Sequence, residues 1–354
     1  MVKRKYMLHF DSDYMEGAHP ELIRRLAETN LEQTPGYGLD EYCHRAERLI
    51  LDACGLTNGK VHFLVGGTQT NSTVIDTLLS HHEGVLAAET AHICSHEAGA
   101  IEVWGHKVLT LPQHDGKISA EDVRKYVADY YSDEMYEHVV APGMVYISHP
   151  TEFGTLYTLD ELTALSKICR EADLPLYMDG ARLGYALASG ASDVTLPDVA
   201  RLCDVFYIGG TKVGALFGEA VVTSRPELLP HFFSIVKQHG ALLAKGRLLG
   251  VQFETLFTDN LYVDISRNAC VMAAKIRKAF IDHGYRLFID SPTNQQFFIL
   301  PNSVIDTLMR VASFELWGPR RERETPVRFV TSWATRESDV DELIAALPQC
   351  PAEY

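Results

Sequence analysis

The fold is decided by an eight-residue stretch, VFYIGGTK (205–212), in which an apolar run leads through a glycine turn to a lysine. A run of apolar residues with branched and aromatic side chains is typical of a buried strand. Two further apolar runs end in polar segments: residues 174–178 lead into DGAR (179–182), and residues 61–65 lead into GGTQTN (66–71). Three predicted strands are therefore each followed by residues that can bind or react with a ligand.

Short apolar runs alternate with amphipathic segments over residues 39–223, and this pattern predicts an α/β fold with a mainly parallel sheet flanked by helices. Ser119 is the expected N-cap of one helix, and Thr158 with Glu161 forms the expected capping box of another. In such sheets ligands bind beyond the carboxyl ends of the strands, where we expect the three polar segments to converge. The predicted strands are 61–65, 85–88, 108–111, 144–148, 174–178, 205–208 and 216–223, and the predicted helices are 39–54, 71–81, 119–131, 158–172 and 197–203.

The sequence pattern changes after about residue 226. Two long helical stretches, 227–239 and 247–283, precede three predicted strands at 286–289, 296–300 and 327–332. This change predicts two domains. A large α/β domain would cover residues 16–250, and a smaller α+β domain would cover residues 251–354 and be joined by the N-terminal segment 1–15.

Composition narrows the class of protein. The chain has 354 residues, of which 46% are hydrophobic and 22% charged, so a sizeable core is expected. The net charge of −15 argues against nucleic acid and anionic membranes as main partners. Seven cysteines without C-x-x-C spacing favour reduced thiols, and no metal site is expected. No apolar run approaches the ~18 residues of a membrane span, and the start lacks a signal region, so we expect a cytoplasmic protein.

Lys212 and Asp179 together suit a pyridoxal phosphate (PLP) site, in which a lysine forms a Schiff base and an aspartate pairs with the pyridinium nitrogen. Arg182 would then reach an anionic group, either the substrate carboxylate or the ring oxygen. Each residue also has an ordinary interpretation. A turn lysine is usually a surface residue, and Asp179 can cap a helix with Arg182 as its neighbour at i+3. The combination at two strand ends favours the cofactor site.

The segment GGTQTN (66–71) matches neither the dinucleotide-binding nor the P-loop pattern and is compatible with a simple strand–helix turn. Glycines before a helix N-terminus nevertheless suit a single phosphate group. His92 follows the predicted strand 85–88, where an imidazole can stack on a flat cofactor or act as an acid or base. A lone histidine is usually structural, and His96, Glu97 and His149 are nearby candidates with weaker support.

These residues together resemble the threonine aldolase family, which lies within the fold-type I PLP enzymes alongside the β-eliminating lyases. The resemblance covers nearly the whole chain and implies an aspartate aminotransferase-like fold. It also implies a homodimer or homotetramer with active sites at the subunit interface. The matching segments are FDSD (10–13), GGT (66–68), Ala91-His92, DGAR (179–182), GTK (210–212) and VRFVTS (327–332).

The resemblance also implies a role for each matching residue. Lys212 would carry the cofactor, Asp179 would bind the pyridine nitrogen, and His92 would stack on the ring. The remaining implied contacts are with the phosphate, from Gly67, Thr68 and Gln69, and with the substrate carboxylate, from Ser12, Arg182 and Arg328.

The chain departs from the family pattern at three places. Thr211 stands where members often have serine, and HPTE (149–152) lacks the Asn-Thr-His of some relatives, so a second catalytic histidine is not carried over. In GALLAKGR (240–247), either Lys245 or Arg247 would replace an arginine that reaches the phosphate of a neighbouring subunit.

The implied reaction is cleavage of the Cα–Cβ bond of L-threonine or L-allo-threonine to glycine and an aldehyde, with His92 as the preferred base. β-Elimination, racemisation and transamination are alternatives on the same scaffold. A binding protein that has lost the chemistry is a further alternative. Intact Lys212, Asp179 and Arg182 speak against it.

Overall fold

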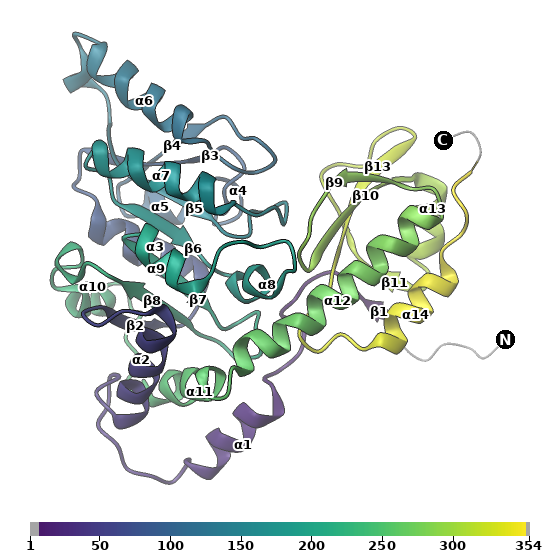
Figure 1. Cartoon of the computed structure of the whole chain (residues 1–354), viewed down its shortest axis with the longest axis horizontal. Helices are drawn as coiled ribbons and strands as arrows, with labels where there is room; N and C mark the ends of the chain where they lie inside the picture. The colour runs from purple at the N-terminus through teal and green to yellow at the C-terminus, as the bar shows by residue number, and fades with distance from the viewer. Residues whose placement is uncertain (1–6, 352–354) are drawn as a thin grey trace.

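The computed structural model describes residues 7–351, and its central element is a seven-stranded sheet (Figure 1). Six strands of this sheet run in the same direction and β8 runs against them. The predicted mainly parallel sheet is therefore confirmed. The strand order is β2 (Lys60–Leu64), β8 (Glu219–Thr223), β7 (Val205–Gly209), β6 (Leu176–Asp179), β5 (Ala141–Ser148), β3 (Glu83–Ala88) and β4 (Lys107–Leu111).

Helices flank the sheet, as Figure 1 shows. The expected caps are present: the side chain of Ser119 accepts from the Asp122 amide, and that of Thr158 accepts from the Glu161 amide. In both cases the acid bonds back to the N-cap amide, which completes the capping box. The helices of this part are α1 (Pro20–Glu28), α2 (Glu41–Cys54), α3 (Gly67–Leu78), α4 (His92–Ser95), α5 (Ala100–Val103), α6 (Ala120–Ser132), α7 (Leu159–Glu171), α8 (Leu183–Ala188), α9 (Leu196–Leu202), α10 (Phe232–Gln238) and α11 (Arg247–Phe257).

A second, smaller group of elements lies beside the main sheet (Figure 1). Its four-stranded antiparallel sheet has the order β12-β13-β10-β9, and β1 (Leu8–His9) pairs in parallel with β11 (Ala312–Ser313). The start of the described chain thus joins the smaller group. The other elements are β9 (Arg286–Ile289), β10 (Gln295–Pro301), β12 (Glu315–Leu316), β13 (Glu324–Val330), α12 (Leu261–Asp282), α13 (Asn302–Leu308) and α14 (Glu337–Ala346).

Two predicted helices are wrong in their extent. The stretch 247–283 is not one helix but two, α11 and α12, because Asp259 and Asn260 adopt left-handed backbone conformations with φ of 51° and 61°. Residues with side chains rarely adopt this conformation, and it interrupts a helix. The stretch 227–239 is likewise reduced to α10, which His231 precedes with a φ of 56°.

Two further element boundaries differ from the prediction. The helix predicted from residue 71 begins at Gly67, so the glycine turn is itself the N-terminus of α3. The first turn of a helix has amides without intrahelical partners in any case, so a glycine costs little there. The last strand ends at Val330 rather than at residue 332.

The buried apolar side chains form two clusters. The larger one follows the seven-stranded sheet and its helices and extends to Ala269 in α12. The smaller one joins Leu8 and Phe10 to residues between Met272 and Leu347. Because α12 contributes to both clusters, it links the two groups of elements; the predicted division between residues 250 and 251 stays a prediction. Within residues 7–351, no helix is long and apolar enough to cross a membrane.

Candidate active site

A cavity of about 450 Å³ lies at the carboxyl ends of the parallel strands. Its lining comes from the segments that follow β2, β3, β5, β6 and β7 and from the start of β8. This volume is typical of a small-ligand site. The cavity brings together most of the predicted site residues, namely Gly67, Thr68, His92, Asp179, Arg182 and Lys212.

Asp179, the last residue of β6, is 5% exposed and accepts four hydrogen bonds. Its Oδ1 accepts from the Tyr207 hydroxyl at 2.6 Å and from the Ala181 amide at 2.9 Å. Its Oδ2 accepts from the Tyr146 hydroxyl at 2.7 Å and from Asn71 Nδ2 at 2.9 Å. Four donors around one carboxyl group favour its ionised form.

His92 is connected to Asp179 through a buried chain of contacts. His92 Nδ1 lies 2.7 Å from Glu97 Oε1, and Asn71 Nδ2 donates to that same oxygen at 2.7 Å. The His92 amide donates to Glu152 Oε1 at 2.9 Å. Burial alone raises the pKa of Asp179, but the neighbouring His92 and the hydrogen bonds outweigh burial and lower that pKa. Asp179 can therefore pair with a protonated ring nitrogen.

Lys212 follows β7 in a loop that turns back towards β8, and its side chain lines the cavity. Burial, reinforced by the positive charge of Arg182, lowers the pKa of Lys212. Glu219, at the start of β8, is 3% exposed and accepts from the Gly210 amide at 3.2 Å. Burial raises the pKa of Glu219 to about 8. A lysine with a lowered pKa is the form that attacks a carbonyl group.

Arg182 is held by a buried carboxylate. Its Nε and Nη2 donate to the two oxygens of Asp13 at 2.7 Å and 3.0 Å, and Asn294 Nδ2 donates to Asp13 at 2.9 Å. Sequence reasoning did not foresee this pair, because 169 positions separate its members. The Nη1 atom of Arg182 makes no hydrogen bond with the described residues, so one edge of the guanidinium group is open to a ligand.

Arg328 and Ser12 do not line the cavity. Arg328 donates to Gln295 Oε1 at 2.8 Å and to Glu315, and its guanidinium carbon lies 5.2 Å from the centre of the Trp317 ring. Its buried Nε has no partner among residues 7–351. Ser12 Oγ accepts a long bond, 3.4 Å, from the amide of Tyr14. The predicted carboxylate-binding roles of Arg328 and Ser12 stay predictions.

The N-terminus of α3 borders the same cavity. Gly66 is the N-cap and no side chain caps the helix, so the amides of the first turn, from Gly67 to Gln69, are available to an anion. The Gln69 side chain is already occupied, since its Oε1 accepts from the Val65 amide at 3.3 Å. A Cβ atom on Gly67 would lie 3.1 Å from the Tyr207 hydroxyl, so this turn packs closely against the Asp179 network.

The chain matches a family model, that of the beta-eliminating lyases, over residues 9–291. The chain belongs to the beta-eliminating lyase family. A low specificity L-threonine aldolase from Pseudomonas sp. is 31% identical over 347 residues, which are 95% of this chain and 96% of that protein.

Solved structures agree with the assignment of the chain to this family. The structure of Leishmania major threonine aldolase is 42% identical, with a TM-score of 0.93, and the match covers 96% of this chain and 98% of that one. A double mutant of aspartate aminotransferase from Thermus thermophilus, 14% identical, shares the fold with a TM-score of 0.69 over 96% of this chain and 90% of its own. The predicted aspartate aminotransferase-like fold is confirmed.

The family and its aminotransferase-like neighbours are PLP enzymes, so this lyase is PLP-dependent. The cavity suits the cofactor. It offers an ionised carboxylate at Asp179 for the ring nitrogen, a lysine with a lowered pKa at Lys212, and the uncapped N-terminus of α3 for the phosphate. These features come from three different strand ends, as the sequence pattern predicted.

Four residues of the site had no role in the sequence interpretation: Glu152 and Glu219 line the lyase cavity, and Asn71 and Tyr146 contact Asp179 without lining it. Tyr146 and Glu219 each place a polar group inside a predicted apolar strand. This pattern could have indicated that each of them has a buried hydrogen-bonding partner. Asn71 and Glu152 carried no such signal. Burial raises the pKa of Glu152, which accepts from the Ser148 hydroxyl at 2.6 Å.

Proposed function

We propose that this PLP-dependent lyase cleaves L-threonine and L-allo-threonine to glycine and acetaldehyde. The observation that carries the proposal is the single cavity in which Lys212, Asp179 and His92 meet, in a chain similar over at least 95% of its length to two threonine aldolases. The cofactor, when bound, would supply an electron-withdrawing ring that stabilises the negative charge left at Cα by Cα–Cβ cleavage.

Each residue at the strand ends has a separate role in the proposed reaction. Lys212 would provide the amine that holds the cofactor aldehyde, and Asp179 would keep the ring nitrogen protonated. His92 would lie against the cofactor ring and would accept the proton of the substrate β-hydroxyl, so that the aldehyde can form as the Cα–Cβ bond breaks. A proton returned to Cα completes glycine. The amides of Gly67, Thr68 and Gln69 bind the phosphate.

The substrate carboxylate would be bound by Arg182, Arg328 and Ser12. Asp13 occupies two nitrogens of Arg182 and thereby orients its Nη1 as the remaining donor. The aromatic ring of Trp317 and the amide oxygen of Gln295 hold Arg328 in place. A pair of arginines suits an α-carboxylate, which accepts two parallel hydrogen bonds from a guanidinium group.

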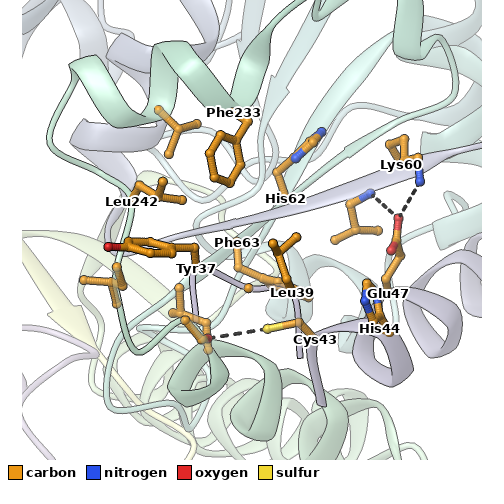
Figure 2. A pocket seen from close by; sticks show the side chains of 16 residues that line it. Tyr37, Leu39, Cys43, His44, Glu47, Lys60, His62, Phe63, Phe233 and Leu242 are labelled. Carbon is orange, nitrogen blue, oxygen red and sulfur yellow. Dashed lines mark hydrogen bonds and ion pairs between the residues drawn. The ribbon is translucent and has the colours of Figure 1, made fainter. Parts of the chain in front are cut away.

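We also propose that the active enzyme is a homodimer or homotetramer with its sites at the subunit interface. A second cavity, of about 270 Å³, is mainly apolar and is rimmed by Tyr37, Leu39 and Phe233, which are 44%, 59% and 50% exposed (Figure 2). Large apolar side chains gathered at a surface mark an interaction site. A second copy of the chain is the occupant that a homo-oligomeric family favours.

The need for a cationic partner for the cofactor phosphate supports the same oligomeric arrangement. The cationic side chains that line the first cavity are Lys212, which serves the aldehyde, and Arg182, which Asp13 already neutralises. In its own chain Arg247 donates to the carbonyl oxygens of Glu32 and Thr29, whereas Lys245 is exposed. We therefore assign the phosphate contact to Lys245 of a neighbouring subunit.

The localisation proposal rests on the thiols. All seven cysteines are free, which suits a reducing compartment, and we place the protein in the cytoplasm. Nucleic acid and membranes are not among the partners that we propose.

The function is tested by incubating the purified enzyme and PLP with L-threonine and with L-allo-threonine. We expect acetaldehyde and glycine in equal amounts from both substrates, and the ratio of rates gives the stereochemical preference. Ammonia with a keto acid would instead identify β-elimination. Protein that binds PLP but releases no aldehyde would overturn the proposed reaction and leave the cofactor assignment intact.

A further inference from the structure

The orientation of the Asn71 side chain is fixed by its neighbours. Its terminal nitrogen lies 2.7 Å from Glu97 Oε1 and 2.9 Å from Asp179 Oδ2, and the side chain is fully buried. Only an NH2 group can face two carboxyl oxygens that both accept. The Asn71 oxygen accepts from the Tyr177 hydroxyl at 2.9 Å, so the two amide hydrogens are the ones directed at the carboxyl oxygens. Both contacted oxygens are therefore acceptors.

This orientation determines the position of the proton on His92. Glu97 Oε1 accepts from Asn71 and also lies 2.7 Å from His92 Nδ1. The Glu97 side chain is 0% exposed and its Oε2 has no partner among the described residues, so Glu97 makes its side-chain contacts through Oε1 alone. We place the hydrogen of the contact on His92 Nδ1, with Oε1 as the acceptor from both His92 and Asn71.

The second ring nitrogen of His92 is then the basic one. His92 lines the active-site cavity with 37% of its side chain exposed, and Nε2 makes no hydrogen bond to residues 7–351. An imidazole whose Nδ1–H is held by a carboxylate has its tautomer and its ring orientation fixed. When Nε2 takes a proton, the carboxylate also stabilises the resulting positive charge.

We propose that Glu97 is a positioning residue that holds His92 as its Nδ1–H tautomer and leaves Nε2 as the proton acceptor for the substrate hydroxyl. This inference rests on the proposed aldol cleavage. Asn71 donates to both Glu97 and Asp179, and it thereby fixes the position of Glu97 relative to the carboxylate of Asp179. The base and the residue that binds the ring nitrogen are thereby kept at one distance from each other.

Two variants separate the hydrogen bond from the charge. Glu97→Leu removes the acceptor, and Glu97→Gln keeps an oxygen that can accept from Nδ1 but loses the negative charge. We expect the kcat of aldehyde release to fall by about 100-fold in Glu97→Leu, the order of a general base contribution. The fall in Glu97→Gln should be smaller. KM for threonine and the affinity for PLP should change by less than about threefold. Glu102→Gln, an exposed site on α5, is the matched control.

The tautomer itself is measured in the cofactor-free protein by nuclear magnetic resonance of 15N-labelled histidine. The His92 signals are assigned by their loss in His92→Asn. We expect a protonated Nδ1 and an unprotonated Nε2 in the wild type and in Glu97→Gln, and a mixture of tautomers in Glu97→Leu. Because Glu97→Gln preserves the hydrogen bonds, it remains informative if the leucine variant fails to fold.

Two results would overturn the inference. One is a wild-type His92 protonated at Nε2, and the other is a Glu97→Leu enzyme with wild-type kcat. If the wild-type enzyme releases no aldehyde, the proposed function fails, whereas the tautomer measurement still decides whether Glu97 positions His92.

Discussion

Two cavities, the polar one at the strand ends and the apolar one of Figure 2, differ in how far a single chain completes them. In the first, Asp179 accepts four hydrogen bonds from its own chain, one of them from the buried Asn71. In the second, Phe233 and Leu39 remain about half exposed. A buried polar group without a partner destabilises the folded chain, whereas exposed apolar surface can be buried later, when another subunit binds. The difference indicates that the buried groups around Asp179 are held by one chain, whereas assembly, and with it the proposed phosphate contact of Lys245, depends on the surface.

The largest effect is expected from Lys212→Ala, which removes the amine that holds the cofactor in the polar cavity. We expect aldehyde release to fall by on the order of 10⁵-fold, as for loss of a nucleophile. The measurement pairs the rate with the absorbance of the bound cofactor before and after borohydride reduction. Lys167→Ala, on the exposed face of α7, is the control. Turnover retained in Lys212→Ala would sink the proposed mechanism.

A smaller loss is expected from Asp179→Asn. The amide is neutral, and its NH2 group would face either Asn71 Nδ2 or the Ala181 amide, both of which are donors. We expect kcat to fall on the order of 100-fold, because the ring nitrogen loses its charged partner and one buried donor loses its acceptor. Steady-state kinetics and the cofactor spectrum measure this. A variant with unchanged kcat would show that the cavity does not depend on the buried carboxylate.

The sequence was sufficient for the sheet, its direction and the three polar strand ends, because apolar runs, glycine turns and capping boxes are local signals. It was not sufficient for the contacts that complete the site. The pair of Asp13 with Arg182 and the bridge from Asn71 to Asp179 join residues that only the tertiary structure brings together. The break between α11 and α12 was missed because Asp259 and Asn260 are acceptable in a helical pattern, although here they take left-handed conformations.

The apolar cavity is tested by Phe233→Asp, which places a charge on its rim. If a second copy covers this surface, burying an unpaired charge should weaken association by about 30-fold or more, the order of an interface hot spot. Analytical ultracentrifugation over a range of protein concentrations measures the change. Val271→Asp, on an exposed position of α12, carries the same charge outside the cavity. An unchanged oligomer in Phe233→Asp would assign the apolar cavity to something other than a second copy.

Glu219 is an exception in the polar cavity, because this buried carboxyl group has few hydrogen-bond donors around it. It accepts from the Gly210 amide and from the Thr211 side chain, and burial raises its pKa to about 8. Between about 4.5, its ordinary pKa, and about 8, the folded cofactor-free protein keeps a proton that the unfolded chain releases. Rising pH therefore favours unfolding in this window, and the stability of the wild type should decrease.

The variant Glu219→Gln removes this proton. From pH 5 to pH 8 its free energy of unfolding should fall less steeply than that of the wild type, by up to about 1.4 kcal/mol per pH unit, the value for one proton. Urea denaturation of the cofactor-free protein at several pH values measures the difference, with Glu102→Gln as the exposed control. Parallel profiles for Glu219→Gln and the wild type would mean that Glu219 is ionised in the folded protein at neutral pH. The lysine would then have a charged partner, and the polar cavity would be as completely satisfied around Lys212 as it is around Asp179.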